Sequence, residues 1–260
     1  MPSQSSGLET RLSVCNGYYR FSKHLDHRDI YSAVKLKASP VYFCKLMKSR
    51  FKLVAFDLDG TLTRTISVWE YLHRRFGTID KARVNADLFF QGKISYEEWA
   101  KLDTNLWRGI SLEYVMDALM EVEYMDGADY VVEVLRRAGV KTLIISAGLQ
   151  ELADLAARRL GVDYALANKL VVVDGILTGD IEVRVGINGK GRILKFFMNL
   201  EGIPRSSTAA VGDDISDISL FEEAGFKIAF NPKVEAIRRI ADVVVESDSL
   251  KAILPYLIDP

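Results

Sequence analysis

Two aspartates that follow an apolar run near residue 55 have the clearest potential for chemistry in this chain. The run Leu53–Phe56 is typical of a buried strand, and Asp57 and Asp59 come directly after it, before a Gly-Thr turn. If both continue the strand, their carboxylates lie about 7 Å apart on one face, where they repel each other and lose water. A divalent cation would offset that cost. The alternative is structural, because Asp and Gly are common where a strand ends in a turn.

Two later apolar runs also end in polar residues. Runs 140–145 and 208–211 have the length and composition of short buried strands. In a parallel sheet, ligands bind beyond the carboxyl ends of the strands, so these ends would lie together if the strands are neighbours. Taken singly, each polar residue could be a helix cap or a surface side chain. Their occurrence at equivalent places favours one shared site. The candidates at the strand ends are Ser146 and Ala147 after the first run, and Asp213 and Asp217 after the second. Lys190, near the start of a predicted helix, is a further candidate.

The chemistry that such a set could perform is phosphoryl transfer. Carboxylates alone repel a phosphate dianion, so Mg²⁺ must bridge them. Lys190, the Ser146 hydroxyl and the Ala147 N–H would neutralise the phosphate oxygens as charge develops. One aspartate of the pair can attack phosphorus and form an aspartyl phosphate. The other can protonate the leaving alkoxide and later deprotonate the attacking water.

Alternating helices and strands must position these residues. In the second half of the chain, short apolar runs alternate with helical patterns, which predicts an α/β fold: a doubly wound, mostly parallel, Rossmann-like sheet. Asp174 and Gly175 predict a hairpin turn. Helical patterns rich in aromatic residues fill 65–125 and predict a small, separate helical cap. We therefore expect a core of residues 51–64 and 126–260, with the cap inserted after the first strand. The breaks between the predicted cap helices fall at Gly77, Gly92 and Gly109.

Composition narrows the class of protein. The 260 residues are 49% hydrophobic and 27% charged with a net charge of −1, and no apolar run approaches the length of a membrane span. These values predict a soluble, cytoplasmic protein and argue against a nucleic-acid partner. Residues 1–50 hold nine Lys and Arg against three acids and predict a basic N-terminal extension, poorly structured or accessory. It could contact an anionic partner, or translation could begin at Met47. Neither a disulfide scaffold nor a metal site is expected from its Cys15, Cys44, His24 and His27.

The candidate residues resemble the four motifs of the haloacid dehalogenase superfamily, in order and with the usual spacings, over about residues 51–258. The matching residues are Asp57-x-Asp59-Gly-Thr, Ser146, Lys190 and Gly212-Asp213-x3-Asp217. The resemblance implies that Asp57 is the nucleophile and Asp59 the general acid and base. It also implies Mg²⁺ on the Asp57 side chain, the Asp59 backbone carbonyl and Asp213, with Asp217 supporting the metal site. Dehalogenases of the superfamily lack the second aspartate because a halide needs no proton, so Asp59 favours a phosphatase.

Within that superfamily the chain looks like the phosphoserine phosphatases, on residues 161–170 and the hairpin 174–179. It also departs from their pattern. The usual Ser, substrate-holding Glu, carboxylate-gripping Arg and Asn are replaced by Gly60, Ile66, Asp103 and Ser216 respectively. Residues that could substitute for the lost substrate contacts are Arg64, Glu70 and Arg108. The catalytic residues are kept, whereas the residues that read the amino acid are not.

The sequence therefore predicts a Mg²⁺-dependent phosphomonoester hydrolase that works through an aspartyl phosphate. Its expected substrate is a small phosphorylated metabolite, with phosphoserine as the first candidate. Two alternatives stay open at this point. One is a phosphotransferase that passes the phosphoryl group to an alcohol, and the other is a non-catalytic binding module on the same fold. The sequence leaves the oligomeric state open.

Overall fold

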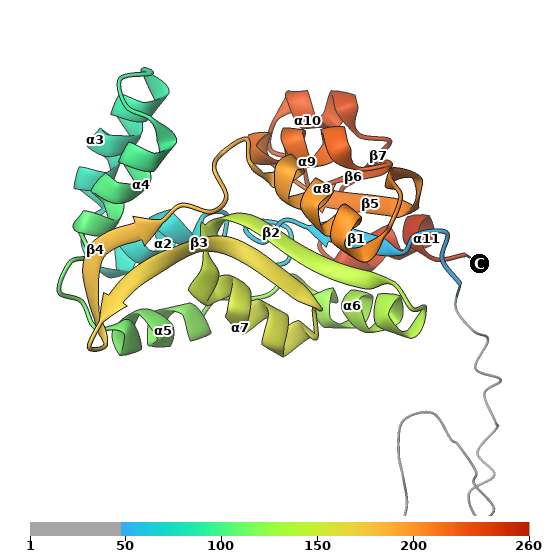
Figure 1. The fold of residues 1–260 in the computed structure, drawn as a ribbon, viewed down its shortest axis with the longest axis horizontal. Helices are drawn as coiled ribbons and strands as arrows, with labels where there is room; N and C mark the ends of the chain where they lie inside the picture. Colours follow the sequence, from blue (N-terminus) through green and yellow to red (C-terminus); the bar gives the residue numbers. More distant parts are fainter. Residues whose placement is uncertain (1–47, 260) are drawn as a thin grey trace, which may run out of the picture. The chain divides into compact units, whose positions relative to one another are not determined.

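A seven-stranded sheet organises the part of the chain that the computed structural model describes, residues 48–259. The strand order is β4-β3-β2-β1-β5-β6-β7, and every neighbouring pair is parallel except β3 and β4 (Figure 1). The strands are β1 (Leu53–Phe56), β2 (Lys141–Leu149), β3 (Tyr164–Val173), β4 (Ile176–Glu182), β5 (Thr208–Gly212), β6 (Phe226–Phe230) and β7 (Val243–Val245). The predicted α/β fold with a mostly parallel sheet is confirmed.

Helices cover both faces of this sheet. The α-helices in the described residues are α2 (Val68–Arg75), α3 (Ile79–Phe90), α4 (Tyr96–Asn105), α5 (Leu112–Met120), α6 (Ala128–Arg137), α7 (Gln150–Leu160), α8 (Lys190–Glu201), α9 (Ile218–Glu223), α10 (Glu235–Ile240) and α11 (Leu254–Leu257). Three short 3₁₀ turns among them are η1 (Arg205–Ser207), η2 (Ile215–Asp217) and η3 (Leu250–Ile253). Figure 1 shows α6 and α7 on one face and α8, α9 and α10 on the other.

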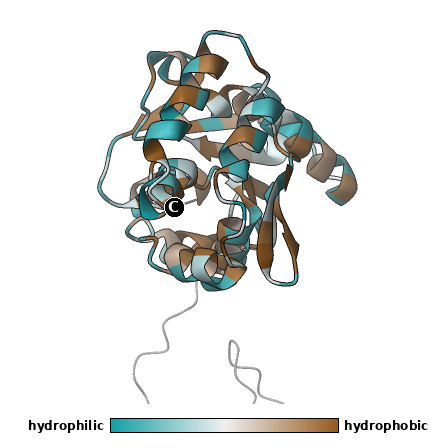
Figure 2. Cartoon of the chain, turned by 90° about the vertical axis from the view of Figure 1, so that its left-hand side faces the viewer, coloured by the Kyte–Doolittle hydropathy of each residue, from teal (hydrophilic) through white to brown (hydrophobic). Residues whose placement is uncertain are grey.

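The alternation of side chains along β1 explains why both faces are covered. All four residues of β1 are buried and apolar. Val54 and Phe56 belong to an apolar cluster with residues of α6 and α7, whereas Leu53 and Ala55 pack with residues of α8, α9 and α10. Successive side chains of a strand point to opposite faces, so a fully apolar central strand requires a helical layer on each side. In Figure 2 the helices carry both apolar and polar residues, as helices with one buried face should.

The four helices α2–α5 lie between β1 and α6, where the helical cap is predicted. Gly77, Gly92 and Gly109, which separate these helices, all have positive φ values. The block does not have a core of its own, because Leu72, Trp107 and Leu119 belong to the same apolar cluster as the sheet residue Phe56. The expected bundle is therefore continuous with the main core in its packing. The domain boundaries 51–64, 65–125 and 126–260 stay predictions.

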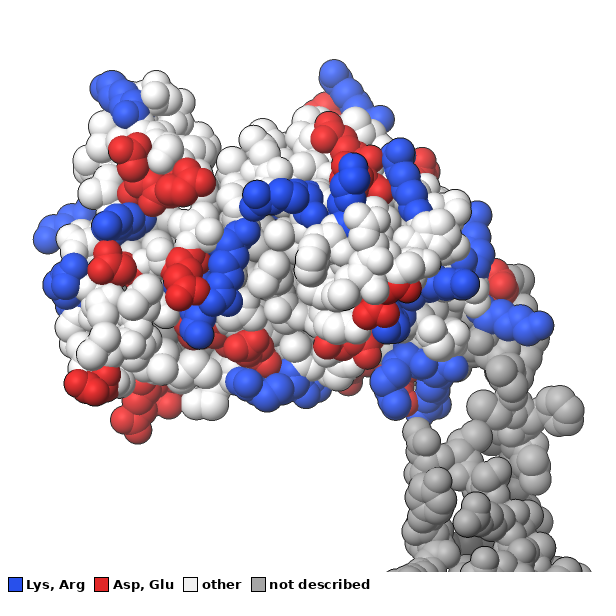
Figure 3. Space-filling view, in the orientation of Figure 1, with Lys and Arg blue, Asp and Glu red and all other residues white. Residues whose placement is uncertain are grey.

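The described residues do not include most of the predicted N-terminal extension. Residues 1–47, with both cysteines, His24 and His27, lie outside them. None of the helices in 48–259 is long and apolar enough to cross a membrane. Over the face seen in Figure 3, Lys and Arg alternate with Asp and Glu, and neither sign dominates that surface.

Candidate active site

Three neighbouring strands bring the predicted residues together. In the sheet β1 lies between β2 and β5, and Phe56 is in register with Ile144 of β2 and Val211 of β5. The residues that follow these positions therefore meet at one edge, and the Asp57 N–H donates to the Val211 carbonyl at 2.9 Å. The convergence expected from the parallel-sheet rule is present in the structure. One difference is that β2 does not end before Ser146 but continues to Leu149.

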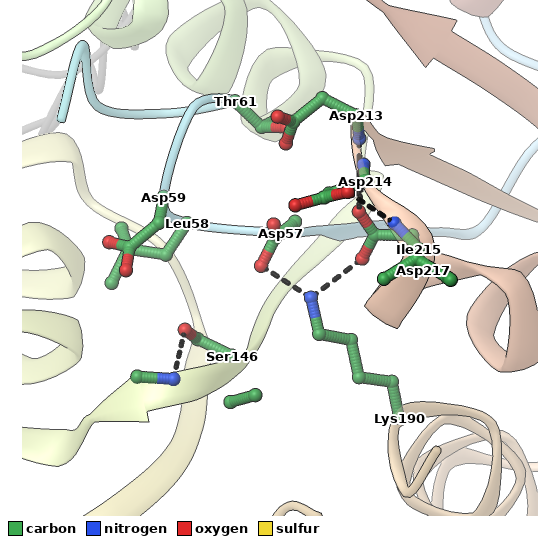
Figure 4. A network of polar contacts seen from close by, with 12 residues as sticks. Asp57, Leu58, Asp59, Thr61, Ser146, Lys190, Asp213, Asp214, Ile215 and Asp217 are labelled. Carbon is green, nitrogen blue, oxygen red and sulfur yellow. Dashed lines mark hydrogen bonds and ion pairs between the residues drawn. The ribbon is translucent and has the colours of Figure 1, made fainter. Parts of the chain in front are cut away.

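Lys190 joins two of the carboxylates. Its Nζ donates to Asp57 Oδ1 and to Asp217 Oδ1, each at 2.6 Å (Figure 4). All three side chains are buried, and Lys190 is only 1% exposed. Burial alone would lower the pKa of Lys190, but the charges of Asp217 and Asp57 outweigh it and raise that pKa. Lys190 is therefore a fixed cation at the first residue of α8, held against the candidate nucleophile.

Asp217 orders the loop after β5. Its Oδ2 accepts hydrogen bonds from the backbone N–H groups of Asp213 and Asp214, at 2.9 and 3.1 Å, while its Oδ1 accepts from Lys190. Both oxygens are thus engaged in holding other groups in place. This geometry fits the role that the resemblance implies for Asp217, which is to support the metal site. It also sets the position of Asp213.

Asp213 faces the turn that follows β1. Thr61 Oγ1 donates to Asp213 Oδ1 at 2.9 Å, and Lys233 Nζ lies 2.5 Å from Asp213 Oδ2. Burial raises the pKa of Asp213 to about 6, although the charge of Lys233 opposes the rise. Lys233 was not predicted as a site residue. It stands shortly after β6, so applying the strand-end rule to that strand, the neighbour of β5, could have found it.

Asp59 turns away from Asp57. Strand β1 ends at Phe56, and the Leu58 carbonyl accepts hydrogen bonds from the N–H groups of residues 61, 62 and 63, which reverses the chain. The sequence suggested that the two carboxylates lie side by side on one strand face, and this expectation is wrong. Figure 4 shows them pointing in different directions. Asp59 Oδ2 accepts from the N–H of Val68, the first residue of α2, at 2.8 Å.

The environment of Asp59 suits a group that exchanges a proton near neutral pH. Its Oδ1 is buried without a hydrogen-bond partner among the described residues. Burial raises the pKa of Asp59 to about 6, although the hydrogen bond from Val68 and the charge of Lys190 oppose the rise. A general acid needs a pKa close to the working pH, and burial is one way to reach it.

Negative charge is in excess at this site. Asp57, Asp213 and Asp217 each offer a carboxylate oxygen within 4.8 Å of the others, and all three are buried. Burial raises the pKa of Asp57 well above its usual range, and the Asp217 and Asp213 carboxylates add to this effect. If every group is ionised, the site has two more negative than positive charges. The carboxylates are those of Asp57, Asp59, Asp213 and Asp217, and the ammonium groups are those of Lys190 and Lys233. Such a set of hard oxygen ligands fits a divalent cation.

Gly60, one of the departures from the phosphoserine phosphatase pattern, lies in a tight turn beside Asp213 and Lys233. Gly60 has φ +84°, in the left-handed region that favours glycine. A Cβ at this position would stand 2.5 Å from Asp213 Oδ2 and 2.6 Å from Lys233 Nζ. A Ser at residue 60 would therefore displace the Asp213–Lys233 ion pair, so Gly60 and Lys233 fit together in this chain.

The end of β2 around Ser146 is held by residues of the helical block and of β3. Ser146 Oγ accepts from the Gly148 N–H at 2.9 Å and is buried. The Ala147 carbonyl accepts three hydrogen bonds, whose donors are Trp69 Nε1, Tyr96 OH and Asn168 Nδ2, at 3.2, 2.8 and 2.9 Å. These bonds fix the peptide group between Ala147 and Gly148, next to the Ala147 N–H. Trp69 and Tyr96 were not predicted as donors because the aromatic residues were interpreted as packing, and Asn168 was not proposed as a site residue.

A pocket of about 240 Å³ opens beside these residues. The predicted residues that line it are Asp57, Asp59, Ser146, Ala147 and Lys190. Asp213 and Asp217 lie behind this wall. Ile66 and Asp103, which replace the expected substrate contacts, also line the pocket. Arg64, Glu70 and Arg108 do not, so the structure does not place the suggested substitutes at the site.

The Asp103 carboxylate contacts other side chains of the helical block. Its Oδ2 lies 3.3 Å from His73 Nε2, and its Oδ1 accepts from Asn85 Nδ2 at 2.8 Å. The Trp107 indole N–H can only donate, and it lies 3.1 Å from His73 Nδ1. His73 Nδ1 is therefore the acceptor, which leaves its Nε2–H facing Asp103. This buried network ties α2, α3 and α4 together.

Comparisons with known proteins agree with this geometry. A family model of haloacid dehalogenase-like hydrolases matches residues 54–222. The phosphoserine phosphatase of Methanocaldococcus jannaschii is 34% identical over 212 residues, which are 81% of this chain and 100% of that protein. The phosphoserine phosphatase SerB2 of Mycobacterium tuberculosis is 32% identical over 78% of this chain and 49% of its own length. A solved structure described as a phospho-aspartyl intermediate analogue of phosphoserine phosphatase is 34% identical, with a TM-score of 0.71 over 80% of this chain and 99% of that one.

Proposed function

The chain belongs to the haloacid dehalogenase-like hydrolases, and from that premise we propose that it is a Mg²⁺-dependent phosphomonoester hydrolase that works through a phosphorylated Asp57. One observation carries the proposal. Asp57 lines the pocket with one oxygen held by the buried Lys190, and Asp59, with a pKa of about 6, lines the same pocket. A nucleophile, a fixed cation and a proton donor thus meet around one space.

The residues divide the reaction into two displacements. Asp57 attacks phosphorus; the bond between its carboxylate oxygen and phosphorus forms as the ester P–O bond breaks, and Asp59 gives its proton to the departing alkoxide. Asp59 then takes a proton from water, whose oxygen attacks phosphorus and displaces the Asp57 carboxylate. Inorganic phosphate and a free alcohol are the products. Lys190, the Ser146 hydroxyl and the Ala147 N–H stabilise the phosphate oxygens.

The acidic residues would hold the cation. Asp57 and Asp213 would supply side-chain oxygens and the Asp59 backbone carbonyl would be a further ligand, while Asp217 keeps Lys190 and the Asp213 loop in place. When bound, Mg²⁺ would supply positive charge to the phosphate oxygens, which the carboxylates alone would repel. This assignment rests on the donor chemistry and on the excess of negative charge.

Several finer statements are part of the proposal. The relatives named above are phosphoserine phosphatases, so phosphoserine is the first substrate to test. A small phosphomonoester is the expected partner, and no nucleic-acid partner is expected from the near-neutral net charge. The cytoplasmic location stays a prediction, and the oligomeric state is open.

Removal of the metal tests the proposal directly. Purified protein is expected to release inorganic phosphate from a panel of small phosphomonoesters with Mg²⁺ and to lose at least about 100-fold of that rate in EDTA, because uncompensated carboxylates repel the substrate. Added Mg²⁺ in excess of EDTA should restore the rate. Phosphate release that is unaffected by EDTA would contradict the metal assignment. Transfer to an added alcohol would indicate a phosphotransferase.

Replacing Lys233 by Met is expected to change the requirement for Mg²⁺. The ammonium group lies 2.5 Å from Asp213 Oδ2, so it competes with a cation for that oxygen. We expect Lys233→Met to lower the Mg²⁺ concentration for half-maximal activity about three- to tenfold, since Lys233 is partly exposed and its charge is partly screened. Lys227→Met is the matched control, because Lys227 is similarly exposed and pairs with Asp242 away from the pocket. An unchanged or higher Mg²⁺ requirement in Lys233→Met would show that Lys233 does not compete.

A further inference from the structure

The proposed phosphatase pocket has walls that suit only some alcohols. We infer that its substrate is a phosphomonoester of an uncharged, apolar, ring-sized alcohol rather than of a charged amino acid such as serine. This inference rests on the proposed function and names the substrate class of the same site. The juxtaposition that carries it is an apolar pocket wall next to cations that are already paired.

Large apolar side chains form much of the pocket wall. Trp69 and Trp99 line it from α2 and α4, and Ile187 lines it from the loop before α8. The pocket of about 240 Å³ is many times the 10–15 Å³ that one ordered water occupies on a comparable measure, so there is room for a ring beside the phosphate. Figure 3 shows a hollow between the α3–α4 end and the rest of the core, bordered largely by uncharged atoms.

Three of the most exposed apolar side chains of residues 48–259 gather at this pocket. Ile66 is 67% exposed, Phe90 is 77% exposed and Ile215 is 55% exposed, and all three line the pocket. A single exposed apolar residue needs no explanation. Three that line one pocket, each from a different segment of the chain, give it an apolar rim that contact with an apolar ligand would cover.

No unpaired cation lines the pocket among the described residues. Among the described residues that line it, the cations are Lys190 and Lys233, and both are already paired with site aspartates. The lining also contains the carboxylates of Asp103 and Asp214, and Asp103 already faces His73 and Asn85. The α-carboxylate of phosphoserine would therefore find hydroxyl groups, such as those of Ser67 and Ser216, but no unpaired cation, which is unfavourable for a group that loses its water.

A comparison of three substrates tests the inference. Benzyl phosphate and phosphoserine are both alkyl esters, so their alkoxide leaving groups need similar proton transfer, and they differ mainly in the charge and apolarity of the alcohol. With the full chain and Mg²⁺, kcat/KM is expected to be at least tenfold higher for benzyl phosphate, since a site with no counter-charge for an ionised group rejects it by at least this factor. Phosphocholine is the third substrate and should also be at least tenfold poorer.

The possible outcomes separate the two proposals. Equal or better turnover of phosphoserine would overturn the inference and leave the phosphatase assignment intact. Preference for phosphocholine would also overturn it, because the aromatic wall would then bind a cation. If none of these esters is hydrolysed, and p-nitrophenyl phosphate is also inert, the proposed function itself fails and the inference fails with it.

A pair of exposed phenylalanines provides a matched variant test. Phe90→Ser removes a rim residue, and Phe196→Ser removes one on α8 that is 59% exposed and outside the pocket lining. Because both rings are mostly exposed, neither change should prevent folding. Phe90→Ser is expected to raise KM for benzyl phosphate at least threefold without changing kcat/KM for phosphoserine, and Phe196→Ser should change neither. An equal effect of both variants, or an equal effect of Phe90→Ser on both substrates, would contradict the proposed rim.

Discussion

Replacing Asp57 by Asn is expected to lower the Mg²⁺-dependent rate of phosphate release by at least about 10³-fold, because loss of a covalent nucleophile removes the reaction path rather than one contact. The amide oxygen of the new side chain could still accept a hydrogen bond from Lys190, but it cannot form an acyl phosphate. The fold should survive the change. Burial and the neighbouring carboxylates already raise the pKa of Asp57, so a neutral group is tolerated at this position.

Two measurements make this prediction specific. Wild-type protein incubated with a labelled substrate and stopped with acid should retain label that hydroxylamine releases, and Asp57→Asn should retain none. Asp214→Asn is the control, because Asp214 lines the same pocket while its side chain caps the following turn, a role that Asn can also fill. That variant should lose only a few-fold in rate. A well-folded Asp57→Asn variant with wild-type turnover would exclude the proposed mechanism.

The arrangement of the sheet was predictable because the strand ends obey a general rule. Apolar runs such as Leu53–Phe56 must be covered on both faces, which requires a parallel sheet with two helical layers. Parallel strands then place their carboxyl ends at one edge. The structure puts Asp57 and Asp213 there, on neighbouring strands. Lys190 was placed at the same edge from its position near the start of a predicted helix, and its order and spacing also match the family pattern.

The residues that sequence analysis missed depend on contacts between distant segments. The hydrogen bonds from Trp69 and Tyr96 to the Ala147 carbonyl join residues 78 and 51 positions apart. Helical spacing predicts which face of a helix is apolar, but not which aromatic ring also donates a hydrogen bond. Lys233 was missed for a related reason, since its ion pair with Asp213 depends on the order of β5 and β6 in the sheet.

The helical block is attached to the same groups that are proposed to perform the chemistry. Asp59 accepts a hydrogen bond from the first residue of α2, and Trp69 of that helix donates to the Ala147 carbonyl. The position of the block is thus linked to the orientation of Asp59 and to the peptide group between Ala147 and Gly148. A substrate that shifts the helical block would therefore also shift Asp59 and the Ala147 carbonyl, because hydrogen bonds join them to α2.

Replacing Asp59 by Asn is expected to have the second large effect, and its size should depend on the leaving group. An Asn amide oxygen can still accept from the Val68 N–H, so the attachment of α2 is kept and only the proton transfer is lost. General acid catalysis contributes about 10²–10⁴-fold, and we expect a loss of that size for alkyl phosphates, whose alkoxides leave only with a proton. For p-nitrophenyl phosphate, whose phenolate leaves without one, formation of the phosphoenzyme should be nearly unchanged.

The second displacement, hydrolysis of the phosphoenzyme, provides the most specific test of this prediction. Asp59 is also proposed to deprotonate the attacking water, so the Asp59→Asn variant should form the phosphoenzyme from p-nitrophenyl phosphate and then hydrolyse it slowly. A rapid release of about one equivalent of p-nitrophenol, followed by slow turnover, is the expected time course, and label should accumulate on Asp57. The raised pKa of Asp59, about 6, allows both roles near neutral pH, since neither protonation state is rare there. An equal loss for alkyl and aryl esters, without the rapid phase, would assign Asp59 a structural role in holding α2.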